Sequence, residues 1–281
     1  MVKTICSLYQ QYPELKKSPA LSDEERTYYG DVIRWEVERK MALPAGSERR
    51  ALMVVAAFSV RRLCELLFRH FGKKPIVLLD EYDTPMQEAW THGYWDDITP
   101  FMRQFMNDIF KDNDYLERGL LTGITRVSKE SILSDLNNLM AVTTTSESFS
   151  DSFGFTEAEV FAAMDEYGLT DREGVKRWYD GFTFGSSSDI YNPWSITNYL
   201  HERRFDAYWV NTSSNALVGA LIQRADAQTK SDFEVLLGGG VLTVPISENI
   251  SFKDLDSKPS VIWSLLLASG YLRGVGKGPN I

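Results

Sequence analysis

Cysteine and histidine are scarce in this 281-residue sequence, which contains two of the former and three of the latter. Cys6 and Cys64 show neither a zinc-binding spacing nor a disulfide framework, and the histidines form no HxxxH or HExxH pair. Zinc sites need clusters of sulfur and nitrogen ligands, so the sequence argues against a zinc enzyme. Two isolated cysteines fit a protein of the reducing cytosol.

Long apolar runs are also missing. The longest, ALMVVAAFSV at residues 51–60, is flanked by arginines on both sides. A membrane-spanning helix needs about 20 mostly apolar residues, so this run predicts a buried helix. Residues 1–17 carry a polar side chain every few positions and lack the apolar segment of a signal peptide. We therefore expect no membrane segment and a cytoplasmic location.

The third shortage is positive charge, because 30 lysines and arginines face 39 acidic residues and give a net charge of -9. This balance argues against a broad basic surface and against nucleic acid as a partner, and it leaves room for a local basic patch. The basic cluster at residues 203–205 is too small to change this expectation. The hydrophobic content of 43% is sufficient for one large or two modest domains.

The first half of the chain has the pattern of an α/β layer. Ser22 and Glu25 have the spacing of a capping box, and residues 44–72 predict one long helix that ends at Gly72. A strand at 75–79, a helix at 96–111 and a strand at 118–125 follow. This order predicts a parallel sheet with flanking helices, and the unbroken apolar run at 75–79 predicts a strand covered on both faces.

The second half looks mostly helical, so we expect two domains, 1–150 and 151–281. A lid and a winged-helix-like subdomain are alternatives for the second. The helical patterns fall at residues 128–139, 156–168, 192–203, 213–225, 231–239 and 259–270. Thr156 with Glu159 predicts a second capping box, and Pro193 suits a first helical position. Residues 241–247 predict a strand or β-wing, and residues 185–189 a flexible loop.

Acidic residues follow the first strand in KPIVLLDEYDTP, at residues 74–85. In a nucleotide-hydrolysing enzyme, Asp80 in this position would bind Mg²⁺ and Glu81 would act as general base or orient the attacking water. The alternative is that a strand simply ends and that acids such as Asp83 start the next helix. The second strand ends near Thr122, Thr125 and Arg126. There an arginine would stabilise charge on a transferred phosphate, or it would be an ordinary surface side chain.

Six ordered segments extend these motifs: KPIVLLDEYDTP, GLLTGITRVSKESILSDLNNL, FGFTEAEV, WYDGFTFG, IYNPWSITNYL and YWVNTSSNALV. Over residues 60–272 the chain closely resembles the predicted AAA-ATPase-like family, bacterial P-loop proteins often fused to a PD-(D/E)XK-type nuclease domain. The resemblance implies a partial P-loop-NTPase-like α/β core that uses ATP and Mg²⁺. It matches Asp80 and Glu81 to the Walker B acids, and Thr125 and Arg126 to the end of a sensor-like strand. The YDGF (179–182) and YNPWSI (191–196) segments match motifs for which packing is the simpler role.

One family feature is absent from the sequence, since no GxxxxGK[ST] loop occurs in it. The nearest match, at residues 274–279, has Gly278 after Lys277 and lies at the wrong end of the chain. This loop supplies most of the grip on the phosphates. Two hypotheses stay open. The chain is part of an ATP-hydrolysing parent protein and has weak or no independent activity, or it is a non-catalytic module that binds itself or a protein partner through an exposed sheet edge.

Overall fold

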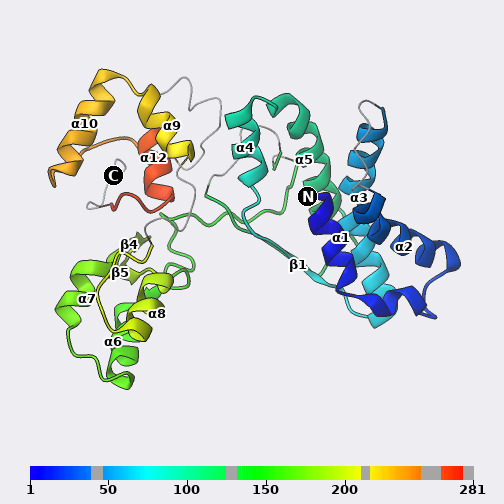
Figure 1. The fold of residues 1–281 in the computed structure, drawn as a ribbon, viewed down its shortest axis with the longest axis horizontal. Helices are drawn as coiled ribbons and strands as arrows, with labels where there is room; N and C mark the ends of the chain where they lie inside the picture. The colour runs from blue at the N-terminus through cyan, green and yellow to red at the C-terminus, as the bar shows by residue number, and fades with distance from the viewer. Residues whose placement is uncertain (39–46, 125–131, 134, 210–215, 248–260, 275–281) are drawn as a thin grey trace. The chain divides into compact units, whose positions relative to one another are not determined.

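The computed structural model describes residues 1–38, 47–124, 132–133, 135–209, 216–247 and 261–274 (Figure 1). The chain divides into two compact units. The first comprises Met1–Gly123 with Val127–Leu139, and the second comprises Met140–Ile281 with Ile124–Arg126. None of the helices in the described ranges combines the length and the apolar character needed to cross a membrane.

The first unit consists of helices and one short parallel sheet. Its elements are α1 (Val2–Gln10), the 3-10 helix η1 (Pro13–Lys17), α2 (Asp23–Glu38), α3 (Ser47–Phe71), β1 (Ile76–Leu79), α4 (Thr84–His92), α5 (Trp95–Phe110) and β2 (Arg118–Leu121). The capping box at the start of α2 is confirmed: the Glu25 amide donates to Ser22 Oγ at 3.2 Å, and the Ser22 amide donates to the Glu25 carboxylate at 2.9 Å. Gly72 follows α3 with φ of +67°, as a helix-ending glycine should.

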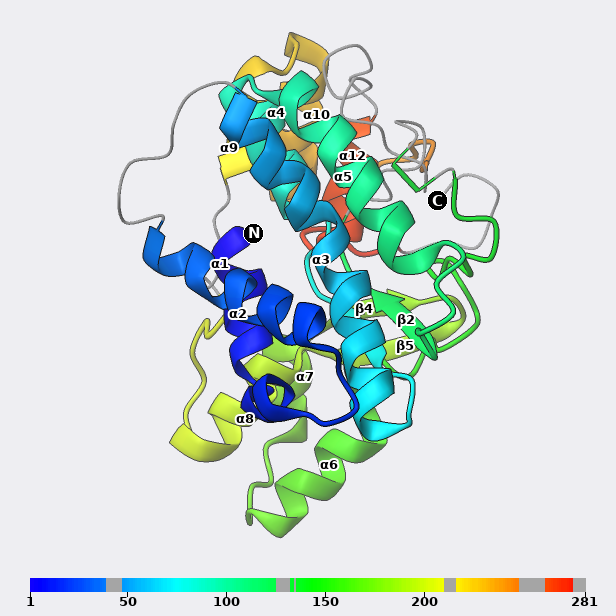
Figure 2. The same ribbon diagram turned by 90° about the vertical axis from the view of Figure 1, so that its right-hand side faces the viewer.

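Helix α3 is the centre of this unit, because α1 and α5 both pack against it (Figure 2). The predicted apolar stripe of α5 is confirmed, since Phe101, Phe105 and Ile109 are all buried. Burial of such a stripe stabilises an amphipathic helix by about 1.5–3 kcal/mol for each large side chain removed from water. Buried apolar side chains on α1, α2 and α3 complete the apolar interior of this helical layer.

Strands β1 and β2 pair in parallel, with Leu79 opposite Leu121. The prediction that β1 is covered on both faces is wrong, because Ile76 is 58% exposed and Leu78 is 72% exposed. Leu120, the partner of Leu78 in β2, is 53% exposed on the same face. An apolar run in a sequence predicts that burying the strand would be favourable. It does not predict whether another part of the same chain packs on the strand. We call Ile76, Leu78 and Leu120 the open sheet face.

The second unit combines an antiparallel sheet with helices. Its elements are β3 (Phe155–Thr156), α6 (Glu157–Glu166), α7 (Arg172–Tyr179), β4 (Asp180–Phe184), β5 (Ser187–Tyr191), α8 (Pro193–Glu202), α9 (Ala216–Arg224), α10 (Ala227–Leu237) and α12 (Val261–Ala268). The strand order is β3-β5-β4. The Thr156–Glu159 capping box and the position of Pro193 are confirmed. The core of this unit lies where α6, α7 and α8 pack on β5, with Met164, Val175 and Tyr191 fully buried.

Three predictions about local structure are wrong. Residues 132, 133 and 135–139 form turns rather than a helix, because Asp135 turns to α5 and accepts bonds from Arg103 (2.8 Å) and Asn107 (3.0 Å); residues 128–131 and 134 lie outside the described ranges. Residues 241–247 form no strand, which fits Pro245, since proline cannot donate to a ladder. The predicted loop at 185–189 is a turn at Gly185 followed by β5.

Candidate functional site

The parallel pairing of β1 and β2 brings Asp80 and Thr122 together, since each is the first residue after its strand. The Thr122 hydroxyl donates to Asp80 Oδ1. The backbone amide of Glu81 donates to the same oxygen at 3.0 Å. The peptide groups are joined as well, because the Thr122 amide donates to Leu79 O and the Tyr82 amide donates to Thr122 O, both at 3.0 Å. These bonds fix the orientation of the Asp80 carboxylate.

Two acidic groups remain open at this end of the sheet. Asp80 and Glu81 are both exposed. In the described ranges, neither Asp80 Oδ2 nor the Glu81 carboxylate has a hydrogen bond or ion pair. Glu81 has φ of +49°, the left-handed conformation that costs a non-glycine residue about 1–2 kcal/mol. The turn that holds this conformation is closed by the Thr84 amide, which donates to Glu81 O at 3.1 Å.

Asp83 has a different role from its two acidic neighbours. Its side chain is buried and accepts a hydrogen bond from Gln87 Nε2 at 3.0 Å. In the chain, Asp83 directly precedes the first turn of α4. A Cβ atom on Gly123 would lie 2.6 Å from Asp83 Oδ1. The question raised by this acidic segment therefore has two answers. Asp83 starts the next helix, whereas Asp80 and Glu81 present carboxylates at the end of the sheet.

Of the four predicted site residues, the structure describes Asp80 and Glu81 and places them together. Thr125 and Arg126 lie outside the described residues. Thr122 was seen in the sequence only as part of a strand end, yet its hydroxyl fixes Asp80. The signal that could have identified it is the register, because the first polar residue after each of two paired parallel strands falls at the same height.

The donor set at Asp80 is compatible with Mg²⁺ but does not form a complete metal cage. Among the described residues no group of three or more His, Cys, Asp or Glu side chains is arranged to hold a metal. Mg²⁺ commonly binds through one or two carboxylates and completes its shell with water and substrate phosphates. Asp80 Oδ2, which is exposed and oriented by the bonds to Oδ1, fits this mode of binding.

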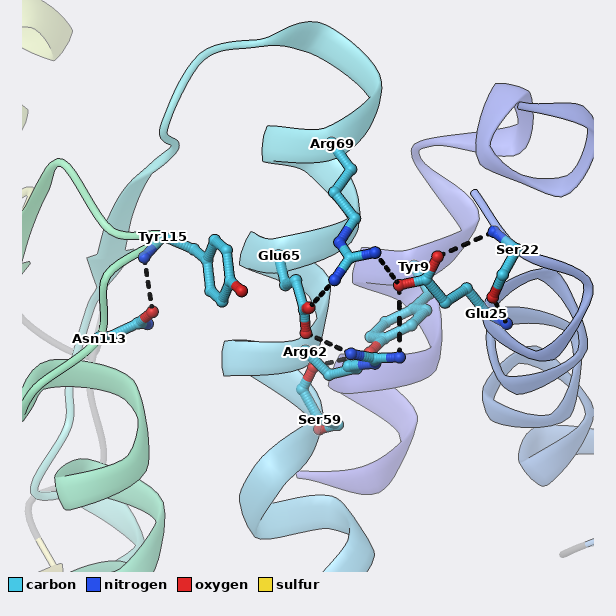
Figure 3. A network of polar contacts seen from close by, with 9 residues as sticks. All are labelled: Tyr9, Ser22, Glu25, Ser59, Arg62, Glu65, Arg69, Asn113 and Tyr115. Carbon is cyan, nitrogen blue, oxygen red and sulfur yellow. Dashed lines mark hydrogen bonds and ion pairs between the residues drawn. The ribbon is translucent and has the colours of Figure 1, made fainter. Parts of the chain in front are cut away.

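In a second polar cluster of the first unit, the charged side chains pair with one another (Figure 3). Glu25, with a side chain 4% exposed, lies 3.1 Å from Arg69 and 3.5 Å from Arg62, and Glu65 contacts both arginines. Tyr9 donates to the Ser59 carbonyl at 2.6 Å. Every charged group in this cluster has an opposite partner. We therefore assign it to the packing of α1, α2 and α3 rather than to ligand binding.

Comparison with known proteins agrees with the motifs. Residues 21–133, which include Asp80, Glu81, Thr122, Thr125 and Arg126, match the family model AAA-ATPase_like, described as Predicted AAA-ATPase. The resemblance predicted from the sequence is thereby confirmed over these residues.

A curated relative extends the similarity beyond this region. The chain is 26% identical over 214 residues to the "Uncharacterized protein in vnfD 5'region" of Azotobacter chroococcum mcd 1. This alignment covers 74% of the chain and 40% of that protein, so the chain spans well under half of the relative's length. No solved structure matches the chain.

Proposed function

We propose that the chain carries part of an ATP-hydrolysing site, with Asp80 as the Mg²⁺ ligand and Glu81 as the residue that orients or deprotonates the attacking water. The observation that supports this most is the Thr122–Asp80 hydrogen bond between the ends of two adjacent parallel strands. It orients Asp80 and leaves Oδ2 and Glu81 open toward a ligand. The family match over residues 21–133 supports the choice of nucleotide.

Each residue of the site has a separate task in this proposal. Thr122 holds Asp80, and Asp80 Oδ2 holds the ion, which when bound neutralises charge on the phosphates. Glu81 lies next to Asp80 in the chain and accepts a proton from water at its exposed carboxylate. Thr125 and Arg126 keep the roles that the family resemblance implies, a contact to the phosphates and stabilisation of developing charge.

The chain by itself is expected to bind Mg-ATP weakly, because its sequence contains no GxxxxGK[ST] loop. Backbone amides and a lysine of such a loop normally hold the phosphates. In this proposal hydrolysis belongs to the longer parent protein, and a fused nuclease domain stays an implication of the family resemblance. The activity of the isolated chain should accordingly be low or absent.

Calorimetric titration with Mg-ATP tests the site. Asp80→Asn keeps an oxygen for Thr122 but removes the charge that holds the ion, and it should abolish the binding heat. Asp96→Asn, at an exposed acid in the first turn of α5, is the matched control and should bind as the wild type does. Equal binding by all three proteins would contradict a nucleotide site at Asp80. The absence of binding in all three would show that the chain alone holds no nucleotide, and the same titration would then be made on the longer parent protein.

A second candidate function is a non-catalytic interaction module, and the open sheet face favours it. Ile76, Leu78 and Leu120 expose apolar surface beside the outer edges of β1 and β2, with which no other strand in the described ranges pairs. Such edges pair readily with another strand. Sedimentation of the wild type and of Leu78→Lys tests this function. Self-association that the substitution removes would support it, whereas a monomer in both would leave only a different protein partner.

A further inference from the structure

An unusual buried acid lies in the second unit, outside the candidate nucleotide site. Asp180 is the first residue of β4, and its side chain is 7% exposed. Asp180 Oδ2 lies 3.5 Å from Arg273 Nη1. Asp180 Oδ1 is fully buried, and none of the residues that the structure describes forms a hydrogen bond with it. An unpartnered buried carboxylate oxygen costs on the order of 1–3 kcal/mol or more, so this atom needs an explanation.

Charged side chains from α6, α7, β5 and the segment after α12 surround Asp180. Lys176 of α7 bridges Glu157 of α6 (2.8 Å) and Asp189 of β5 (3.2 Å). Tyr191 of β5 donates to Glu157 at 3.2 Å, and Arg273 follows α12. Three carboxylates thus face two cations, which leaves one negative charge without compensation. Lys176 is engaged by Glu157 and Asp189, and Arg273 reaches only Oδ2 of Asp180, so neither cation contacts the buried Asp180 Oδ1.

Only a proton or a bound cation can compensate such a charge at low cost. In the ranges that the structure describes, no arrangement of three or more His, Cys, Asp or Glu side chains could hold a metal. A proton remains. Burial raises the pKa of Asp180 above its ordinary value; the Arg273 guanidinium opposes this, and the adjacent Asp189 carboxylate adds to it.

We propose that Asp180 carries a proton shared with Asp189, and that this proton clamps the β4–β5 hairpin. With the proton, one carboxyl group donates to the other across the two strands. Without it, two carboxylates repel each other in a buried position. Asp189 has a left-handed backbone, with φ of +57°, and its carboxylate also accepts a hydrogen bond from Ser188 Oγ at 2.9 Å. The hairpin also carries the segment after α12, because Gly270 approaches Phe182 so closely that a Cβ would lie 2.6 Å from the ring.

The proton on Asp180 makes the stability of the hairpin depend on pH. A carboxyl group whose folded-state pKa is raised binds its proton more tightly in the folded protein. The stabilisation is therefore complete below the ordinary value of 3.8 and is lost as the pH rises through the raised value. The hairpin should open more often at neutral pH than under mildly acidic conditions, and the segment at Gly270–Arg273 should open with it.

Hydrogen exchange of the hairpin, corrected for intrinsic rates, tests the clamp. Asp180→Asn has the shape of the protonated acid and should slow exchange of Asp180–Tyr191 several-fold at neutral pH. The wild type should approach the same protection as the pH is lowered toward the ordinary carboxyl value of 3.8. Asp165→Asn is the matched control, because it removes an exposed acid that pairs with Arg172 at 2.8 Å. It should leave the hairpin unchanged at both pH values.

Three results would overturn the clamp. Faster exchange in Asp180→Asn at neutral pH would show that the ion pair with Arg273 dominates. Protection of the wild type that depends on added Mg²⁺ or on a chelator would show that a cation compensates Asp180. The third result comes from an NMR titration of the carboxyl groups in the wild type. A titration midpoint of Asp180 at or below 3.8 would contradict a retained proton. In agreement with the clamp, Asp189→Asn should lower that midpoint.

Discussion

Neutralising Glu25 should destabilise the first unit far more than neutralising an exposed acid of the same helix. Glu25 is enclosed between α2 and α3, with its side chain 4% exposed, and it contacts both Arg62 and Arg69 (Figure 3). Glu25→Gln keeps the oxygen that caps Ser22 but removes the charge that holds the arginines. The arginines then share Glu65 alone.

The magnitude can be worked from these contacts. A hydrogen bond between charged groups contributes about 1.5–3 kcal/mol when buried. The arginine side chains are 34% and 44% exposed, so water screens part of this contribution. We expect Glu25→Gln to lower the free energy of unfolding by about 1–2 kcal/mol. With a urea dependence of roughly 1–3 kcal/mol/M, the midpoint should fall by about 0.3–2 M.

Urea unfolding followed by circular dichroism measures this change. The matched control is Asp31→Asn on the same helix, where Asp31 pairs with Arg34 and both side chains are at least 51% exposed. An exposed pair contributes about 0–1 kcal/mol, so this control should shift the midpoint little. Equal shifts for Glu25→Gln and Asp31→Asn would refute the argument that burial makes the Glu25 cluster stabilising.

Three further predictions concern single sites. Gly123→Ala should destabilise the first unit by about 1–3 kcal/mol in the same urea assay, because its Cβ would lie 2.6 Å from the buried Asp83 carboxylate. Burial raises the pKa of Cys64 to about 11, so a thiol reagent at neutral pH should label it only when denaturant is added. The bonds from Arg103 and Asn107 lower the pKa of Asp135 to about 2. Its contribution to stability should therefore persist down to the ordinary value of 3.8 and be lost as the pH falls through about 2, and in Arg103→Gln its NMR midpoint should rise toward 3.8.

Features governed by local rules could be read from the sequence. The capping boxes at Ser22 and Thr156 involve residues three positions apart, and the stripe on α5 repeats with the helical period. Asp80 and Glu81 were identifiable because they follow an apolar strand directly. In each case the residues that decide the structure are neighbours in the chain.

Features that depend on tertiary pairing could not be read in this way. The bond between Thr122 and Asp80 joins residues 42 positions apart and requires the register of β1 and β2. The charged surroundings of Asp180 form only when the chain folds, since Arg273 lies 93 positions away in the sequence. The aromatic residues of the YDGF segment predict packing, and its aspartate predicts a polar contact or a turn, but neither pattern predicts a carboxylate oxygen buried without a partner among the described residues.

The two candidate functions place complementary requirements on one small sheet. Lys73 and Lys74 precede β1, so they lie at the end of the strand opposite Asp80, and the six residue steps from Lys74 to Asp80 span about 20 Å when extended. They cannot neutralise phosphates that approach Asp80. Burial of the open sheet face of Ile76, Leu78 and Leu120 would remove apolar surface from water. Binding of ATP at Asp80 would require additional groups that hold the phosphates. A segment or partner that docks on this face and brings such groups would meet both needs, and Mg-ATP affinity would then rise when the partner binds. If Leu78→Lys removed association and left Mg-ATP affinity unchanged, the two functions would be independent.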